Sequence, residues 1–192
     1  MRLFLGLLFT FAVAAVVGLG STWLVLNYGV RYGSVQIGAW SAWPKTGTTD
    51  IDPYAKAGVA RSGELPIGLG DGVAFYASKD DNGRQLDGRC DVVIEGITPQ
   101  ARYWTMTLYN RDGQLIANSA NRYGFTSQEI VRNAVGRFKI TAAPRVRAGN
   151  WLPTAALEHF VLVLRLYDTP VGVATRAGRE APMPSITQGN CT

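Results

Sequence analysis

Hydrophobic residues run without interruption near the start of the chain and then alternate with polar residues over much of the remainder. The run from Leu3 to Leu26 contains no charged side chain. As a helix rising about 1.5 Å per residue it would extend roughly 36 Å, enough for the ~30 Å hydrocarbon core of a bilayer. We therefore predict a transmembrane anchor over residues 1–30, a linker over residues 31–50 and one folded domain over residues 51–192.

The apolar run has two interpretations, a retained anchor and a cleaved signal peptide. Residues 12–14, Ala-Val-Ala, resemble a cleavage site. Apolar residues continue well beyond them, whereas the apolar region of a signal peptide has about 7 to 15 residues. Trp23, Tyr28 and Tyr32 then follow where an aromatic belt would lie. These features favour the anchor, but the basic residues on its two sides are nearly balanced and leave its orientation open.

The domain begins with a helix signal and continues with strand signals. Asp52 suits the N-cap and Pro53 the first helical position, and Ser62-Gly63 would end this helix. Turns are predicted at Asp80–Gly83 and Asn110–Gly113. Strands are predicted over Val73–Ser78, Arg89–Ile97, Tyr103–Tyr109, Gln114–Asn118, Gly136–Ala142 and His159–Asp168.

The strand pattern predicts a mostly β fold. His159–Asp168 is apolar on both faces in its middle, which is typical of a central strand covered on both sides. Many short strands with one short helix indicate an all-β domain, a β-sandwich or jelly roll, after the transmembrane helix.

Charge and cysteine content limit the function classes. The chain has 19 basic and 14 acidic residues, a net charge of +5, and the basic residues are scattered, so we do not expect nucleic acid as a partner. Cys90 and Cys191 are either free, one of them acting as a redox thiol, or form a disulfide that holds the C-terminal tail. A disulfide would persist in the periplasm. With a cytoplasmic N-terminus, this favours a single-pass protein of the bacterial inner membrane with a periplasmic domain.

The sequence predicts neither a cofactor nor a metal site, and we assign no catalytic residue. His159 is the one histidine, so a histidine-based metal cluster is not expected, and no nucleophile elbow is present. Glu129, Asp112 and Asp168 lie near predicted loops, which leaves an acid–base role for carboxylates open.

A group of polar and aromatic residues remains as the candidate ligand site. Aromatic rings with Asn and Arg can stack against a sugar and hydrogen-bond to it. In the alternative interpretation, the aromatic residues fill the core and the polar side chains satisfy backbone groups. The candidates are Asn118, Asn121, Arg122, Tyr123, Trp151 and Arg165, with Asn150 and Tyr167 beside them.

An ordered set of segments resembles the bacterial domain-of-unknown-function family 1214. The resemblance implies a jelly-roll-related β-sandwich in the cell envelope. Long members carry a preceding domain of family 1254, so the resemblance also suggests a short membrane-anchored form whose partner is a separately encoded 1254-type protein. Cys90 stands where an aromatic residue is commoner. The matching segments are Asp52–Ala57, Leu65-Pro66, Asp81–Gly83, Leu86–Gly88, Tyr103–Tyr109, Asn121–Tyr123, Asn150–Pro153 and Phe160–Tyr167 with Pro182.

Three functions follow as hypotheses. The first is a non-enzymatic accessory or subunit of an envelope complex, anchored in the inner membrane through Leu3–Leu26. The second is a binding module for a glycan or small polar ligand, and the third is a hydrolase that acts through carboxylates.

Overall fold

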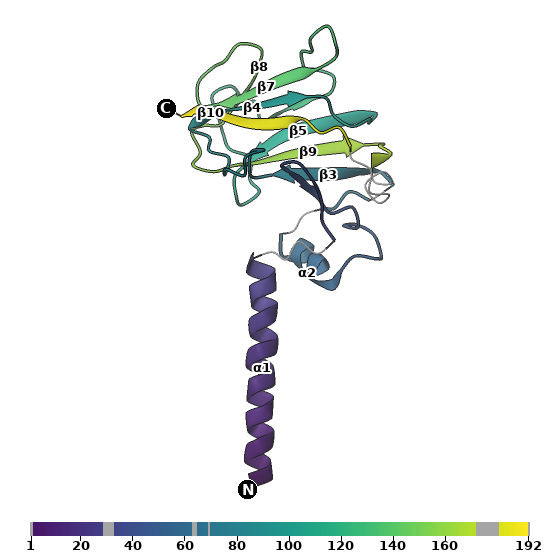
Figure 1. Ribbon diagram of the computed structural model, residues 1–192, viewed down its shortest axis with the longest axis vertical. Helices are drawn as coiled ribbons and strands as arrows, with labels where there is room; N and C mark the ends of the chain where they lie inside the picture. The colour runs from purple at the N-terminus through teal and green to yellow at the C-terminus, as the bar shows by residue number, and fades with distance from the viewer. Residues whose placement is uncertain (1, 29–32, 63–64, 69, 172–180, 192) are drawn as a thin grey trace.

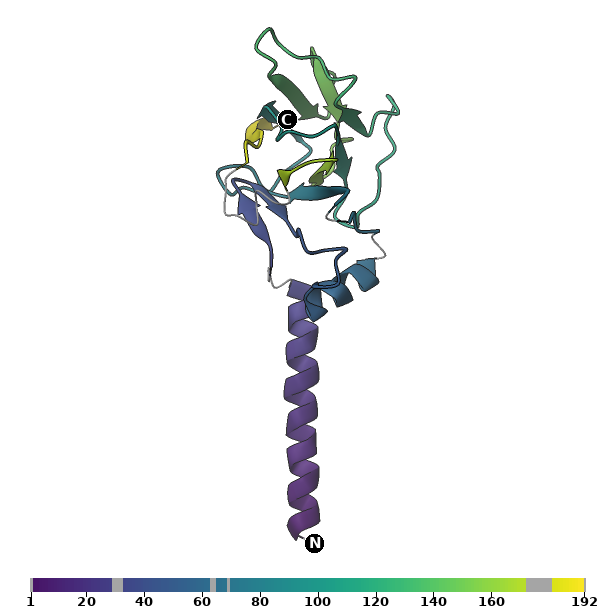
Figure 2. The ribbon, with the colours of Figure 1, turned by 90° about the vertical axis from the view of Figure 1, so that its right-hand side faces the viewer.

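The computed structural model describes residues 2–28, 33–62, 65–68, 70–171 and 181–191. Within this part of the chain there are two helices and ten strands, and the strands form two sheets (Figure 1). One long helix projects from the domain, and the short helix lies between its upper end and the nearer sheet (Figures 1 and 2). The predicted mostly β fold is confirmed, whereas the jelly-roll relationship stays a prediction.

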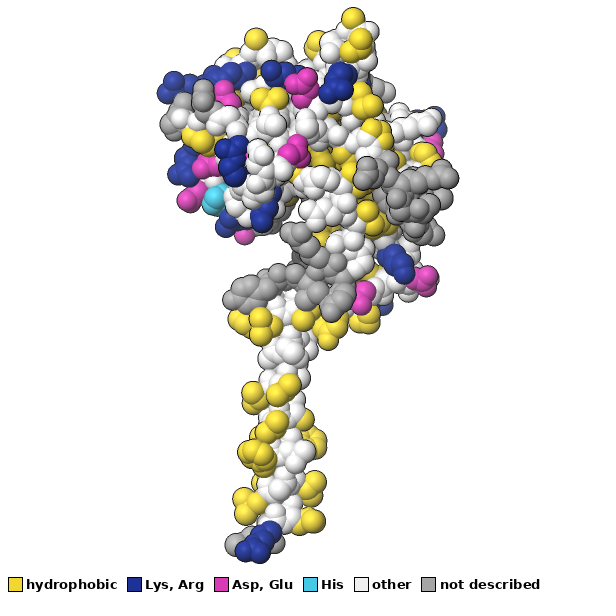
Figure 3. All heavy atoms as spheres, in the orientation of Figure 1, with side chains coloured by type: hydrophobic (Ala, Val, Ile, Leu, Met, Phe, Trp, Pro, Cys, Tyr) yellow, Lys and Arg dark blue, Asp and Glu magenta, His cyan; other side chains and the backbone are white. Residues whose placement is uncertain are grey.

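The N-terminal helix α1 (Arg2–Tyr28) is apolar over nearly its whole length. Its segment Arg2–Leu26 is long and apolar enough to cross a membrane, and its most apolar stretch buries no residue inside the protein. Figure 3 shows hydrophobic side chains along α1 and basic ones only at its start. The Thr10 and Thr22 hydroxyls donate hydrogen bonds to carbonyls one turn earlier, so these polar groups are satisfied within the helix. Tyr32 lies outside the described residues.

The larger sheet is antiparallel throughout. β9 pairs with β3 on one side and with β5 on the other, which confirms the predicted central strand. Residues at alternate positions of β9, such as Leu162 and Leu164, are fully buried in the core. The strand order is β1 (Val35–Ile37), β2 (Trp40–Ala42), β3 (Gly72–Ala77), β9 (Val161–Tyr167), β5 (Tyr103–Tyr109), β6 (Gly124–Thr126).

The smaller sheet contains one parallel pair, β7 with β8. The buried side chain of Asn150 holds that pair together. Its Nδ2 donates hydrogen bonds to the carbonyls of Lys139 and Val131, and its Oδ1 accepts one from the backbone N–H of Val131. The start of β8 is therefore fixed to β7 and to the loop before it. The strand order is β10 (Ser185–Cys191), β4 (Cys90–Gly96), β7 (Phe138–Ala143), β8 (Asn150–Pro153).

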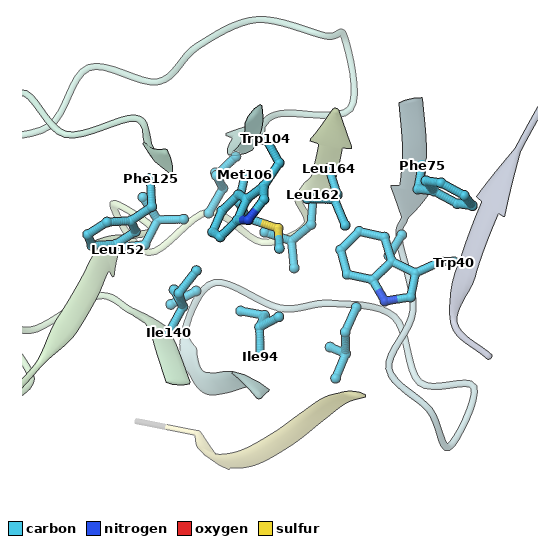
Figure 4. Close-up of a cluster of buried hydrophobic side chains, with 14 of the residues drawn as sticks. Trp40, Phe75, Ile94, Trp104, Met106, Phe125, Ile140, Leu152, Leu162 and Leu164 are labelled. Atoms are coloured by element: carbon cyan, nitrogen blue, oxygen red, sulfur yellow. The ribbon is translucent and has the colours of Figure 1, made fainter. Parts of the chain in front are cut away.

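The core lies between the two sheets (Figure 4). Trp104 of β5 and Phe138 of β7 make a ring contact across it, with centroids 5.3 Å apart. Burial of these side chains supplies the main driving force for packing the sheets together. The fully buried members include Trp40, Phe75, Ile94, Met106, Ile140, Leu152, Leu162 and Leu164. Because these side chains lie between the two sheets, the face of the larger sheet that points away from the core can contact other parts of the protein.

The short helix α2 (Pro53–Ser62) begins as the sequence predicts. Asp52 Oδ1 accepts hydrogen bonds from the amides of Tyr54 and Ala55 at 2.9 and 3.2 Å, which satisfies two donors that the helix itself leaves unpaired. The last described residue of α2 is Ser62, because Gly63 lies outside the described residues.

Two segments differ from expectation. Residues 35–42, within the predicted linker, form the hairpin of β1 and β2, and β2 pairs with β3. The predicted strand Gln114–Asn118 is wrong, although the turn before it closes through a hydrogen bond from the Gly113 amide to the Asn110 carbonyl. The edge of β5 is already occupied, since β5 pairs with β6 and the Leu108 amide donates to Tyr123.

The C-terminal strand β10 is held by a disulfide and by the turn at residues 80–84. Cys90 and Cys191 are bonded and lie opposite each other on β4 and β10, so the disulfide interpretation is confirmed. The Asp81 carboxylate accepts a hydrogen bond from the Ile186 amide at 2.8 Å. The Arg84 guanidinium donates to the Gln188 carbonyl at 2.6 Å. β10 therefore depends on this turn as well as on β4.

Acid should weaken this turn through Asp80. Burial alone raises the pKa of Asp80. That pKa nevertheless lies below its ordinary value, because the carboxylate accepts hydrogen bonds from the Arg84 amide, the Arg84 guanidinium and the Asn82 amide and is attracted by the positive charge of Arg84. The carboxylate therefore contributes stability above pH ~3.9, the unfolded value, and this contribution is lost as the pH falls through the lower folded pKa. The free energy of unfolding, measured by urea titration, should fall less steeply between about pH 5 and pH 3 for Asp80→Asn than for the wild type. An unchanged acid slope would contradict the assignment.

Candidate functional site

The structure divides the predicted polar and aromatic group between two places. The side chain of Asn118 holds the loop before β6 in place. Its Nδ2 donates hydrogen bonds to the carbonyls of Ile116 and Arg122, and its Oδ1 accepts one from the backbone N–H of Arg122. Asn121 is exposed in the same turn with a positive φ of 47°, a conformation that Asn tolerates better than most residues. Both residues serve the turn in this structure.

Arg122 and Trp151 meet at the edges of the two sheets. Arg122 Nη1 donates to the Trp151 carbonyl at 3.1 Å, and its guanidinium lies 5.3 Å from the Phe125 ring centroid. Trp151 Nε1 donates to the Ala143 carbonyl at 3.1 Å. The two Arg122 contacts connect β6 of the larger sheet to β8 of the smaller one, whereas the Trp151 ring donates within the smaller sheet. Tyr123, half-buried, precedes β6. A polar ligand at this position stays a prediction.

Arg165 lies elsewhere, on the outer face of the larger sheet. Its Nη1 donates to the Tyr109 hydroxyl at 3.1 Å, and its guanidinium carbon lies 5.4 Å from the Tyr109 ring centroid. On the same face, the rings of Tyr167 and Tyr103 have centroids 5.9 Å apart. The sequence thus placed Arg165 in one group with Arg122, but the fold puts them in different environments.

A pocket of about 620 Å³ lies on this outer face, at the end of the domain nearest α1; we refer to it as the base pocket. β3 and Arg165 of β9 form its floor, and α2 forms one wall. The segments after β2 and after α2, with Val25 and Leu26 from the last turns of α1, complete it. Figure 2 shows α2 between the upper end of α1 and the sheet. The volume falls within the ~300–1,000 Å³ typical of small-ligand sites.

The base pocket is mainly apolar, with aromatic side chains and one cation. Trp43 and Tyr76 meet edge to face, with ring centroids 5.9 Å apart. Tyr54 and Val59 contribute from α2. Among the described residues that line the pocket, Arg165 is the one with a charged side chain. Sequence reasoning missed these aromatic residues because they come from a predicted linker, a helix and a strand, and only folding brings them together.

The carboxylates considered for acid–base chemistry have local structural contacts. Glu129 Oε1 accepts a hydrogen bond from the Thr126 amide at 2.8 Å. Asp168 is exposed and faces Arg102 at 3.9 Å, and Asp112 is exposed in the turn after β5. In the described part of the chain, three or more His, Cys, Asp or Glu side chains do not gather into a group that could hold a metal ion.

Comparison with a solved structure shows that this fold occurs in a longer protein. The VPA0106 protein from Vibrio parahaemolyticus aligns with a TM-score of 0.59 and 23% identity over 76% of this chain and 37% of that one. An uncharacterised protein from Burkholderia cenocepacia aligns with a TM-score of 0.45 and 16% identity over 67% of this chain and 32% of that one. The chain thus spans well under half the length of either protein.

No curated protein of known function matches the chain. The resemblance drawn from the ordered sequence segments has direct support from a family comparison. Residues 71–171, more than half of the chain, match the family described as Protein of unknown function (DUF1214), and the chain therefore belongs to this family.

Proposed function

We propose that this protein is a single-pass, membrane-anchored component of the bacterial cell envelope whose periplasmic domain acts by binding, as an accessory subunit and not as an enzyme. The observation that carries the proposal is the base pocket, because the end of the apolar helix α1 and the folded domain build it jointly. A pocket at that junction lies at the membrane surface when α1 spans the bilayer.

The proposed location is supported by three features. α1 exposes large apolar side chains along its length, which water would solvate poorly and lipid would accept. The disulfide between Cys90 and Cys191 suits an oxidising compartment such as the periplasm. The domain follows α1 in the chain, so a cytoplasmic N-terminus puts the domain on the periplasmic side.

The proposed binding role is supported by the chemistry of the base pocket. Its lining offers apolar surface, aromatic rings and a cation, all of which hold ligands. General acid–base catalysis needs proton-transferring groups within reach of one substrate, and the carboxylates of Glu129 and Asp168 instead contact the Thr126 amide and Arg102. We propose a separately encoded 1254-type protein as the companion of the domain.

Two measurements on the C-terminally tagged full-length chain test this proposal. In spheroplasts, added protease should remove the domain, whereas in intact cells the outer membrane should protect it. Purification from native membranes in mild detergent should yield a stoichiometric companion, identified by mass spectrometry. A cytoplasmic protein serves as the control for spheroplast integrity. A domain that resists protease in spheroplasts would refute the orientation, and a clean monomer would refute the role as a subunit.

A further inference from the structure

We propose that the base pocket takes up the acyl chain of an anionic single-chain amphiphile drawn from the host membrane, with the anionic head group at Arg165. This inference rests on the proposed function, because it requires the pocket to lie at the membrane surface. It names a chemical class of ligand, a long-chain carboxylate or an equivalent anionic amphiphile, for a site that combines an apolar volume with one cation.

The walls of the base pocket match an acyl chain. Apolar and aromatic side chains from five separate segments surround the volume, and burying the methylene groups of a chain there removes them from water. Gly58 of α2 lines the pocket, and a Cβ atom placed on it would meet no atom within 4 Å. The glycine therefore leaves open space in the wall formed by α2.

The Arg165 guanidinium in the base pocket has N–H groups that make no hydrogen bond within the described residues. Arg165 is half-buried, and within the described residues its one hydrogen bond goes to the neutral Tyr109 hydroxyl. Among those same residues no carboxylate lies within ion-pair distance of Arg165, whereas Arg84, Arg89, Arg102 and Arg147 each face an aspartate. A partly desolvated guanidinium with free N–H groups favours an anionic oxygen acceptor.

The lining of the base pocket includes the end of the membrane-spanning stretch. Val25 and Leu26, at the end of the membrane-spanning stretch, contribute to the lining. Leu65, also at the pocket, is 97% exposed. Figure 3 shows hydrophobic side chains gathered around the upper end of α1, beneath the domain. An acyl chain that leaves the bilayer beside Val25 and Leu26 is therefore next to the pocket.

The test measures binding of oleate and of uncharged oleyl alcohol to the purified full-length chain in a neutral detergent, by native mass spectrometry. The wild-type chain should bind one oleate and prefer it over oleyl alcohol by about tenfold, the equivalent of ~1.4 kcal/mol for a hydrogen bond to a charged group. Arg165→Gln should abolish this preference and keep the binding of oleyl alcohol. Arg102→Gln, which removes an exposed arginine outside the pocket lining, is the matched control and should leave the preference unchanged.

A second variant reduces the volume of the base pocket and leaves the charge of Arg165 unchanged. Gly58→Leu fills the pocket from α2 and replaces a poor helix former with a good one, so it should keep the fold while weakening both ligands about tenfold or more. Unchanged binding in folded Gly58→Leu, or an unchanged oleate preference in folded Arg165→Gln, would overturn this inference. If a companion protein copurifies but oleate does not bind, only this inference is refuted. If oleate binds but no companion copurifies, only the role as a subunit is refuted.

Discussion

Replacing Trp40 by alanine is expected to lower the free energy of unfolding by about 3–5 kcal/mol, the range for large aromatic truncations in a core. Trp40 is only 1% exposed and lies between the two sheets (Figure 4). Its Nε1 donates a 2.7 Å hydrogen bond to the carbonyl of Pro184, the residue before β10. Alanine removes both the packed ring system and this donor, which leaves a cavity and a carbonyl that has lost its partner.

The measurement is denaturant unfolding of the full-length chain in detergent, followed by near-ultraviolet circular dichroism. Trp40→Phe is the matched control because it keeps an aromatic ring but loses the donor to Pro184. We expect it to cost less, about 1–3 kcal/mol for the unsatisfied buried carbonyl. A loss below about 1 kcal/mol in Trp40→Ala would show that residues 35–42 are not part of the folded core.

Removing the disulfide is expected to lower the free energy of unfolding by about 2–4 kcal/mol. Cys90 and Cys191 are separated by 101 residues, so the crosslink constrains most of the unfolded domain. It also closes the end of β10 against β4, beyond the register irregularity between Gln188 and Cys191. Without the bond, β10 is still held by hydrogen bonds to β4, to the turn at residues 80–84 and from the Asp87 amide to the Gln188 side chain.

Thermal unfolding of the double variant Cys90→Ser with Cys191→Ser, with and without reductant, checks this expectation. The oxidised wild type should have the highest midpoint, and reductant should lower it to the value of the double variant. The double variant should not respond to reductant, which controls for other effects of the reagent. Equal midpoints for oxidised wild type and double variant would mean that the hydrogen bonds alone hold β10.

The local elements were largely predictable from the sequence because their causes are local. Alternation of apolar and polar residues predicted Tyr103–Tyr109 with the bounds of β5, and two apolar faces predicted β9 as a central strand. Asp52 before Pro53 predicted the start of α2. The apolar run predicted α1. Each of these signals lies within one stretch of sequence.

Short strands and strand pairing were not predictable in this way. β1, β2 and β6 have three residues each, too few for a periodic signal, and they become strands because a neighbouring edge is free to pair. The expected strand Gln114–Asn118 failed for the same reason, because β6 and Tyr123 occupy the edge of β5. Pairing partners far apart in the chain decided these cases.

The sequence by itself determined an apolar helix, a mostly β domain, a pair of cysteines and a set of polar and aromatic candidates. Tertiary structure decided which of those candidates meet. Arg122 and Trp151 join the edges of the two sheets, whereas Arg165 enters the base pocket with residues of α1, α2 and β3. Such a site depends on the relative placement of distant segments, and that placement is set by core packing and sheet register, to which the residues of the site contribute little.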